Sequence, residues 1–345
     1  MNIYDISKKA GVSIATVSRV LNESSRVSEK TKDKVLRVIA EMGYTPNVFA
    51  RGLGLNTMKT VGILCADSSD TYFAQAIALI EQELRHNGYN SILCCTGFAL
   101  ETKKSSLRLL LSKRVDSIIL IGSSYIEPDD GDNDYIREAA TEIPIMTING
   151  ALAGNGIYST LCDDYQGTLH ATETLLDEGK RSLVYLYNAH SYSGERKVRG
   201  FLDAHGKRQL PVPDERLLFV DSISGSLSGI VERLHALHDT GLPIDGIVAS
   251  DDRLAAAALK FAKAGELAVP GEFAVVGYNN SDIAEFCDPE LSSVDSRLEL
   301  ICRHCIRTLL QVLEGKEMPQ QTMFSATLVH RGTTSPIIGK DGISR

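Results

Sequence analysis

Apolar residues near the start of the chain repeat at helical spacing in two short runs. The positions that would share a buried face are Ile6, Ala10, Val17, Val20 and Leu21. Between the two runs, Gly11 suits a tight turn and Ser13 suits the N-cap of the next helix. The pattern predicts a helix-turn-helix over residues 3–22.

A third helical pattern follows, which Ser28 can cap and Gly43 can end. Its apolar face would hold Val35, Val38, Ile39 and Met42. Three helices in so short a span predict a compact headpiece over residues 1–45.

Residues 46–58 are predicted to form a hinge helix and linker. Pro46 suits the first turn of a helix, but Gly52 and Gly54 interrupt the helix soon afterwards. Isolated helices shorter than roughly 12 to 15 residues are marginal in water. We therefore expect this helix to become ordered when the headpiece binds its target.

After the hinge, short apolar runs alternate with amphipathic helices. Strands are predicted at residues 61–66, 91–95, 117–121, 145–148, 183–187, 246–249 and 274–276. Helices are predicted between them at residues 74–86, 103–111, 166–178 and 254–263. This alternation predicts parallel sheets, and a break near residues 161–164 divides them into two similar lobes. The predicted fold is a small all-α headpiece followed by an α/β core of two Rossmann-like lobes.

Charge separates the headpiece from the core. Residues 1–60 carry ten Lys and Arg against five Asp and Glu, a net charge of +5, so the whole-chain charge of −8 leaves −13 on residues 61–345. A basic segment on an otherwise acidic protein indicates local contact with phosphate. We therefore expect the headpiece, and not the acidic core, to bind nucleic acid.

The outer face of the second helix has the chemistry needed to read DNA. It carries Ile14, Ala15, Thr16, Ser18, Arg19 and Asn22. Such a mixture suits thymine methyl groups, phosphates and base edges. The alternative is a pair of amphipathic helices in an unrelated bundle.

The headpiece and hinge resemble the lactose-repressor family of bacterial transcription regulators. The helix-turn-helix, the third helix and a Pro-Asn-x-x-Ala-Arg-x-Leu hinge at residues 46–53 occur in the family's order. The resemblance implies that Leu53 wedges into the minor groove, where an apolar side chain can unstack a base step. The predicted DNA contacts are Tyr4, Ser13, Ile14, Ala15, Thr16, Ser18, Arg19, Asn22, Asn47, Ala50, Arg51 and Leu53.

The same resemblance extends over the core and implies a periplasmic-binding-protein-like arrangement. In the family the chain crosses between the lobes three times, and here the crossings would lie near residues 161, 291–295 and 322. The expected first lobe is residues 59–161 and 292–322. The expected second lobe is residues 162–291 and 323–345.

Polar residues follow several predicted strands, and ligands of open parallel sheets bind beyond those strand ends. The candidate effector-binding residues are Asp67, Tyr72, Phe73, Ser193, Arg196, Asp251 and Asn279. Carboxylates and amides suit hydroxyl groups, an arginine suits an anion, and aromatic rings suit a sugar or base face. Most other polar residues at these ends are expected to be helix caps and turn residues.

The chain departs from its relatives at two of these positions, Asp251 and Asn279. Asp251 and Asp252 stand where the family usually has Asn-Asp, and Asn279 stands where many members have Asp. Either Arg196 or Lys197 matches the family's effector-binding arginine. We therefore predict the place of the pocket, with a sugar or sugar phosphate as the expected effector, a purine as a weaker one and a protein co-regulator as an alternative.

No enzyme motif is present. The sequence lacks a GxGxxG after a strand, a P-loop lysine, an HExxH and a nucleophile elbow. Cys302 and Cys305 form a CxxC within a helical pattern, without a second pair at zinc spacing. We expect no catalytic residues, cofactor or metal. The main alternative is a sugar-binding transport component or sugar-active protein of the same two-lobed fold, which would carry an export signal in place of the helix-turn-helix.

We expect a cytoplasmic homodimer, most simply a repressor controlled by a small effector. The N-terminus has no signal peptide, no segment has the roughly 20 apolar residues of a spanning helix, and seven cysteines fit a reducing compartment. One headpiece reads too short a site for specificity, so two related by symmetry would read a pseudo-palindromic operator in double-stranded DNA. No leucine heptad follows Arg331, which favours a dimer over a tetramer.

Overall fold

The computed structural model describes residues 2–21, 26–43, 57–220 and 226–335. Three helices form the headpiece: α1 (Ile3–Ala10), α2 (Ile14–Leu21) and α3 (Glu29–Met42). They enclose a small core of Ile6, Ala10, Val17, Val20, Val35 and Val38. Gly11 and Gly43 take left-handed conformations at the ends of α1 and α3, and the Ser13 hydroxyl accepts a hydrogen bond from the Thr16 backbone N–H. The predicted helix-turn-helix is confirmed.

Part of the predicted DNA-contacting set lies outside the described residues. This part comprises Asn22, Asn47, Ala50, Arg51 and Leu53. The hinge helix within residues 46–58 therefore stays a prediction.

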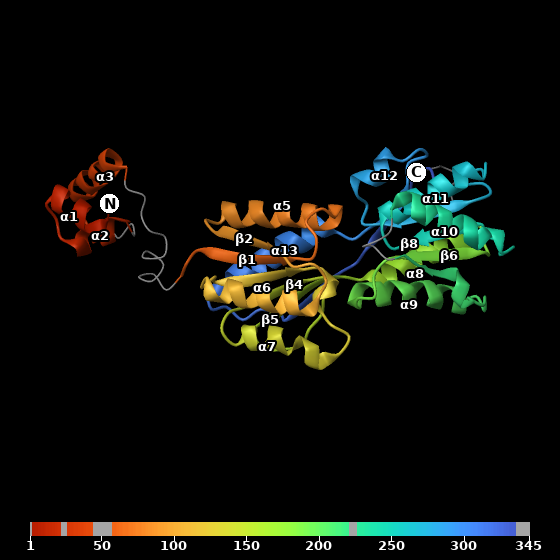
Figure 1. Ribbon diagram of the computed structural model, residues 1–345, viewed down its shortest axis with the longest axis horizontal. Coiled ribbons are helices and arrows are strands. Elements are labelled where there is room, and N and C mark those ends of the chain that lie inside the picture. The colour runs from red at the N-terminus through yellow and green to blue at the C-terminus, as the bar shows by residue number, and fades with distance from the viewer. Residues whose placement is uncertain (1, 22–25, 44–56, 221–225, 336–345) are drawn as a thin grey trace, which may run out of the picture.

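The first lobe is built on a wholly parallel sheet (Figure 1). Its strands are β1 (Thr60–Cys65), β2 (Asn90–Cys95), β3 (Ser117–Ile121), β4 (Ile145–Ile148), β5 (Ile157–Cys162) and β11 (Gln321–Phe324), in the order β11-β5-β4-β3-β1-β2. Helices α5 (Thr71–His86) and α13 (Leu298–Leu313) enclose a core on one face. Helices α6 (Leu100–Ser112) and α7 (Asp134–Ala140) cover the other face.

The second lobe repeats this plan. Its strands are β6 (Leu183–Tyr187), β7 (Leu217–Phe219), β8 (Gly246–Ala249), β9 (Ala274–Tyr278), β10 (Ser292–Asp295) and β12 (Thr327–Val329), in the order β12-β10-β9-β8-β6-β7. Only the pairing of β12 with β10 is antiparallel among those described. Helices α8 (Asp164–Asp177) and α9 (Tyr192–Gly206) pack on one face, and α10 (Leu227–Asp239) and α11 (Asp252–Ala264) pack on the other.

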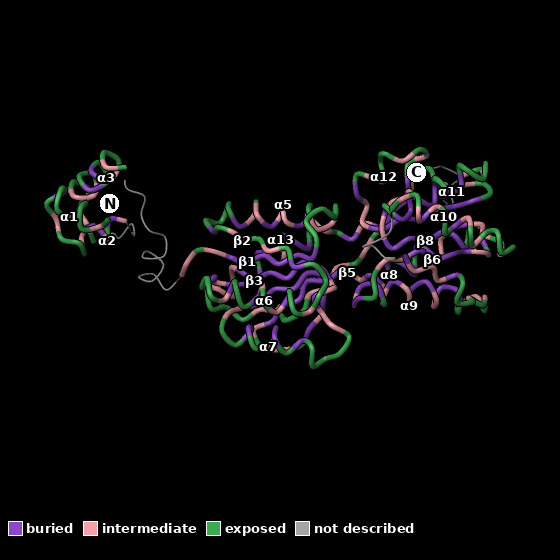
Figure 2. The backbone as a smooth tube through the Cα atoms, viewed as in Figure 1, coloured by how far each residue is buried: buried purple, intermediate pink, exposed green. Residues whose placement is uncertain are grey.

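Short elements complete the described chain. They are helix α12 (Asp282–Phe286) and the 3-10 turns η1 (Ser123–Tyr125), η2 (Asp130–Asn133) and η3 (Asp214–Arg216). The central strands of both sheets run through the interior as buried segments, whereas the edge strands β2, β7, β11 and β12 are partly exposed (Figure 2). Within the described ranges, no helix is long and apolar enough to cross a membrane.

The chain crosses between the lobes after β5, after β10 and after β11. Our expected first-lobe segment, residues 292–322, therefore begins too early, because β10 pairs with β9 and β12 of the second sheet. Strand β11 pairs with β5 as far as Phe324, so the third crossing follows that residue. The sequence pattern missed β5, β7, β10, β11 and β12, since short strands acquire their identity from their neighbours in the sheet.

The crossings approach one another closely where α8 begins. A Cβ atom on Gly167 would lie 2.8 Å from the Ala326 Cβ and 2.9 Å from the Tyr278 hydroxyl. Ala326 belongs to the third crossing and Tyr278 ends β9. Glycine is therefore required at the point where the lobes are joined.

The start of the first lobe is fixed at its far end. The Asp116 carboxylate accepts hydrogen bonds from the backbone N–H groups of Met58 and Thr60, each at 2.9 Å. Asp116 directly precedes β3, which pairs with β1. The chain is thus held firmly where it enters the first sheet.

Candidate DNA-binding face and effector cleft

Helix α2 has one buried face and one open face. Val17 and Val20 are buried in the headpiece core, whereas Ile14 is 40% exposed. Ala15 and Arg19 are also exposed, and Thr16 and Ser18 are half-buried. The open face therefore offers methyl groups, hydroxyls and a guanidinium group beside one another.

Two of the predicted DNA contacts have a structural role as well. The hydroxyls of Ser13 and Thr16 lie 2.9 Å apart and share a hydrogen bond at the start of α2. Tyr4, on α1, is 65% exposed. Each of these side chains keeps polar atoms at the surface of the headpiece.

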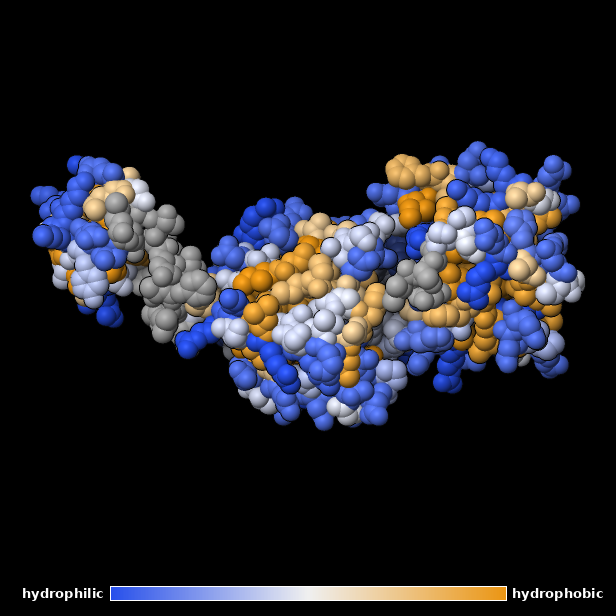
Figure 3. Space-filling model, viewed as in Figure 1, coloured by the Kyte–Doolittle hydropathy of each residue, from blue (hydrophilic) through white to orange (hydrophobic). Residues whose placement is uncertain are grey.

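Seven candidate effector-binding residues lie at strand ends or in the first turns of the following helices. Asp67 follows β1, Tyr72 and Phe73 begin α5, Ser193 and Arg196 begin α9, Asp251 follows β8, and Asn279 follows β9. The two sheets face each other at these ends, because the Ser123 hydroxyl of the first lobe donates to the Ser191 hydroxyl of the second at 2.9 Å. Figure 3 shows the surface hollowed between the lobes.

A buried network forms the floor of this cleft. The Asp164 carboxylate is 2% exposed and accepts hydrogen bonds from the Ser193 hydroxyl at 2.6 Å and the Tyr278 hydroxyl at 2.7 Å. The Lys197 ammonium group donates to the Ser250 carbonyl oxygen and lies 3.6 Å from the Tyr278 ring centroid. Burial raises the pKa of Tyr278 well above its ordinary value. The Ser193 hydroxyl is therefore already occupied by Asp164.

Arg196 and Lys197, the two candidates for one family position, have different environments. The Arg196 guanidinium group donates to the Asp163 carboxylate at 3.0 Å, and its Nε atom is buried without a hydrogen-bond partner in the described residues. Lys197 is buried in the network below. Arg196 is therefore the member of the pair with an unused donor.

The Asp251 carboxylate is held from two sides. One oxygen accepts the Leu254 backbone N–H at the start of α11, and the other accepts the Asn188 side-chain amide at 2.7 Å. The Ser250 hydroxyl donates to the Asn188 carbonyl oxygen at 3.2 Å. Asn188 was absent from our candidate set, although it directly follows a predicted strand.

Asp252 is a structural residue. Its carboxylate is 1% exposed and accepts hydrogen bonds from the Ser281 N–H, the Ser281 hydroxyl and the Ser293 hydroxyl. Burial raises its pKa to about 6, although these hydrogen bonds act in the opposite direction. Asp252 therefore joins α11 to β10 rather than facing the cleft.

Asn279 has a left-handed backbone with φ of 91° and lines an open groove of about 700 Å³. Its N–H donates to the Val294 carbonyl oxygen at 2.8 Å. The groove is also lined by Gln75 and Leu79 of α5 and by Leu298 of α13. Both lobes therefore contribute to the space beside Asn279.

The first-lobe wall is held by one local turn and by two contacts between distant residues. The Asp67 carboxylate accepts hydrogen bonds from the Ser69 N–H and hydroxyl, and these lower its pKa. The Tyr72 hydroxyl accepts a hydrogen bond from the Asn149 amide at 2.9 Å. The Phe73 ring packs against Gly122, where a Cβ atom would lie only 2.6 Å from the ring.

An aromatic cluster stands at the outer end of the second-lobe wall. The His190 and Phe219 rings stack with centroids 4.4 Å apart, and Tyr187 meets Phe219 edge-on at 5.3 Å. Phe219 ends β7, the edge strand of the second sheet. Sequence pattern could not reveal this cluster, because His190 and Phe219 are far apart in the chain.

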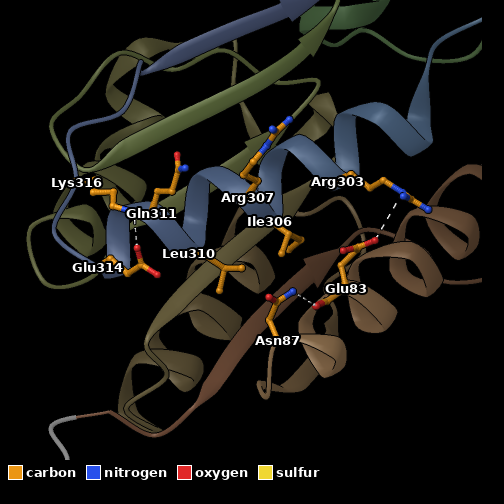
Figure 4. A pocket seen from close by; sticks show the side chains of 9 residues that line it. All are labelled: Glu83, Asn87, Arg303, Ile306, Arg307, Leu310, Gln311, Glu314 and Lys316. Carbon is orange, nitrogen blue, oxygen red and sulfur yellow. Dashed lines mark hydrogen bonds and ion pairs between the residues drawn. The ribbon is translucent and has the colours of Figure 1, made fainter.

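A second groove, of about 320 Å³, lies between α5 and α13 on the first lobe (Figure 4). Arg303 pairs with Glu83 across it, and Lys316 pairs with Glu314 at its end. The neighbouring cysteines of the CxxC, Cys302 and Cys305, are fully buried, and burial raises the pKa of both thiols. In the part of the chain that the structure describes, no group of three or more His, Cys, Asp or Glu side chains could hold a metal ion.

Comparison with known proteins places the chain in a family. Residues 2–47 match the model described as bacterial regulatory proteins, lacI family, and residues 172–334 match a periplasmic binding protein-like domain. A transcriptional regulator with a helix-turn-helix from Lachnoclostridium phytofermentans is 51% identical over 335 residues, covering 97% of this chain and all of that one. The chain belongs to the lacI family.

Other lacI-family proteins show the same relationship over the full length. The transcriptional regulator DegA of Bacillus subtilis is 31% identical, over 97% of this chain and 98% of its own. The fold matches the lac repressor dimer bound to operator with a TM-score of 0.86 and 24% identity, over 97% of this chain and 99% of that one.

Membership of the lacI family confirms the predicted resemblance and fold. The protein is a transcription regulator with a DNA-binding helix-turn-helix and an effector-binding domain, and it is not an enzyme. Regulators of this family bind DNA and small-molecule effectors and act as dimers. The alternative of a transport component is set aside, because these full-length relatives are regulators.

Proposed function

We propose that this protein is a cytoplasmic repressor that binds a pseudo-palindromic operator as a homodimer and responds to a small polar effector between its lobes. The observation that carries the DNA-binding part is the open face of α2. There Ile14, Ala15 and Arg19 are exposed while Val17 and Val20 are buried in the headpiece core. Relatives named as the repressor PurR are consistent with negative control.

The predicted DNA contacts divide into two classes. Arg19 reaches base edges from α2, whereas the hydroxyls at the start of α2 contact phosphate and fix the orientation of the helix. Four further predicted contacts belong to the hinge and lie outside the described residues: Asn47, Ala50, Arg51 and Leu53. We propose that the hinge contacts the minor groove.

The first experiment is selection of binding sites from random double-stranded DNA with the full chain. We expect an inverted repeat, because two symmetric headpieces read two half-sites. With that operator, Arg19→Ala should cost about 1 to 3 kcal/mol of binding free energy while binding to random DNA changes much less.

Arg37→Ala is the matched control, since Arg37 is an exposed arginine on α3. It removes the same charge and should leave the preference for the operator unchanged. Equal loss on operator and random DNA in the Arg19 variant would make Arg19 a phosphate contact. Recovery of no inverted repeat would contradict the proposed symmetric mode of binding.

The first-lobe edge supports the proposed homodimer. Strand β2 is the edge of its sheet, and exposed apolar side chains gather beside it, with Leu93 43%, Phe98 44% and Leu109 50% exposed. Figure 3 shows apolar surface over the region of β2 and α6. A bare apolar edge strand invites association, and a second copy of the chain would cover it.

Leu93→Glu tests this interface by sedimentation. We expect the variant to fold, because Leu93 is exposed, but to remain monomeric and to bind the operator more weakly. Met323→Glu is the control, since Met323 is 38% exposed on β11 at the opposite edge of the same sheet. A dimeric Leu93 variant would place the interface elsewhere.

The effector part of the proposal rests on the cleft. Asp67, Tyr72 and Phe73 would contact the effector from the first lobe, and Arg196, Asp251 and Asn279 from the second, with Ser193 acting through Asp164. Ligand binding there favours one angle between the lobes over others. A sugar or related polyhydroxyl compound fits this set of carboxylates, amides and rings best.

A further inference from the structure

Three of the helices that begin at the cleft have an aspartate carboxylate as their N-cap. The Asp70 carboxylate caps α5, Asp163 caps α8 and Asp251 caps α11, each accepting a backbone N–H from the first turn. The N-terminus of a helix attracts anions because its N–H groups and dipole are positive. In these three helices that attraction is already satisfied by a carboxylate of the chain.

The fourth helix, α9, begins with a neutral cap. The Ser191 hydroxyl accepts the Gly194 N–H, and Glu195 follows within the first turn. This helix also holds the contact with Ser123 of the first lobe. Serine hydroxyls therefore occupy the N-terminus of α9, and the Glu195 carboxylate offsets the positive end of the helix dipole.

Basic side chains near the cleft already have partners. Arg196 donates to Asp163, and Arg297 lies 3.7 Å from the Asp295 carboxylate. The Lys197 ammonium group is buried against the Ser250 carbonyl and the Tyr278 ring. The unused donor among them, the Arg196 Nε atom, is buried and has no partner within the described residues. A phosphate group would have to reach that buried atom or displace one of these partners in order to gain a cation.

Carboxylates face the cleft from both lobes. Burial raises the pKa of Asp70, and the charge of Asp251 across the cleft adds to this rise. Asp67 stands on the same wall as Asp70 and is exposed. An anion placed between the lobes would therefore meet like charge on both sides.

The polar and aromatic groups of the second lobe span four neighbouring strands. Asn279 follows β9, Asp251 follows β8, Asn188 follows β6, and Phe219 ends β7. Adjacent strands lie about 4.8 Å apart, so three spacings extend over about 14 Å. That distance exceeds the length of one pyranose ring.

The chemistry along this row suits hydroxylated rings. The Asn188 amide and the Asp251 carboxylate form a hydrogen-bonded pair of polar groups. Beside them the stacked His190 and Phe219 rings offer apolar faces. Amide and carboxylate groups bind hydroxyls, and aromatic faces cover the C–H face of a sugar.

From the charge and the length of this row, we infer that the effector is an uncharged saccharide of two or three units rather than a phosphorylated sugar. The inference rests on the proposed function, in which a small polar effector binds between the lobes. One end of the saccharide lies near Asn279, and the other lies against the aromatic cluster of Tyr187, His190 and Phe219.

The test is thermal melting of the full chain with a panel of probes. The panel contains neutral disaccharides and trisaccharides, their parent monosaccharides, the 6-phosphates of those monosaccharides, and purine bases. We expect at least one neutral disaccharide or trisaccharide to raise the Tm more than any monosaccharide, phosphate or purine. A larger shift from one of the other classes, or no shift from any saccharide, would overturn the inference.

Two variants locate the saccharide that raises the Tm. Phe219→Leu keeps apolar volume but removes the ring, so affinity for the longer saccharide should fall about tenfold while affinity for the monosaccharide is retained. Phe286→Leu is the control, because Phe286 is 84% exposed on α12. An unchanged affinity in the Phe219 variant would remove the aromatic cluster from the site.

A third variant tests the role of charge. Asp70→Asn combined with Asp251→Asn preserves the helix caps, because asparagine caps as well as aspartate. In this variant the 6-phosphate of the monosaccharide should gain affinity relative to its unphosphorylated parent. An unchanged ratio would contradict the electrostatic argument.

Operator binding separates the two proposals. A saccharide that raises the Tm but leaves operator affinity unchanged would contradict the proposed control by the effector while supporting the ligand class. A phosphorylated sugar that both raises the Tm and alters operator affinity would support that control and overturn the ligand class.

Discussion

The two lobes share one plan of strands and helices but hold their acidic residues in different ways. In the first lobe, Asp67 and Asp70 accept hydrogen bonds only from residues two or three positions away. In the second lobe, Asp164 and Asp252 bond to groups at least 29 positions away in the chain. The carboxylates of Asp164 and Asp252 are therefore held by contacts between distant parts of the chain, whereas those of Asp67 and Asp70 are held within their own turns.

The largest loss of stability is expected when Asp164 is removed from the second-lobe network. Asp164→Ala leaves the buried hydroxyls of Ser193 and Tyr278 without their acceptor. Each unsatisfied buried group costs about 1 to 3 kcal/mol, so the free energy of unfolding should fall by about 4 kcal/mol. Urea unfolding measures this loss. A loss below about 1 kcal/mol would show that the wall does not depend on the network.

A pH effect of about 3 kcal/mol is expected from Asp252. Burial raises its pKa from 3.8 to about 6, so the folded chain retains a proton that the unfolded chain has released. Its contribution to stability is therefore present below about pH 4 and is lost as the pH rises through about 6. Relative to Asp252→Asn, the wild-type chain should lose stability across this interval.

Unfolding of both proteins at a series of pH values checks this prediction. The comparison with Asp252→Asn removes titrations that the two proteins share. A constant difference between them from pH 4 to pH 7 would mean that Asp252 titrates alike in the folded and unfolded chains.

The smallest effect is expected in the first lobe. Asp67 is exposed, and it contacts only Ser69 in its own turn among the described residues. Asp67→Ala should therefore change the free energy of unfolding by less than about 0.5 kcal/mol. The same urea series used for Asp164 measures it. A loss comparable to that of Asp164→Ala would erase the distinction between the two walls.

The sequence predicted the parts of the fold that depend on local pattern. Continuous apolar runs located β3 and β6 at their observed bounds. Strand β10 was placed in the wrong lobe, because its serines show no apolar pattern and its identity comes from pairing with β9. Short strands that are defined by pairing with distant strands show no clear pattern in a single sequence.

From the sequence, candidate site residues could be named only where they closely follow a predicted strand. Asp251 follows a strand and is expected at the cleft, but its partner Asn188 lies 63 positions away in the chain. The Asp164 network joins residues up to 114 positions apart. Such distant contacts decide which carboxylate lies at the cleft and which one supports the fold. Asp251 lies beside the cleft, whereas its neighbour Asp252 is buried and bonded to Ser281 and Ser293.

The double hydrogen bond of Asp116 fixes the end of the first sheet at which the linker enters. Strand β1 runs from that anchored end to the cleft, and six residues of strand extend over about 20 Å. Because Asp116 directly precedes β3, which pairs with β1, Met58 and Thr60 are held to the first sheet itself. Because Asp116 grips both Met58 and Thr60, there is little slack at that attachment. A rotation of the first lobe would therefore carry residues 58–60 with it.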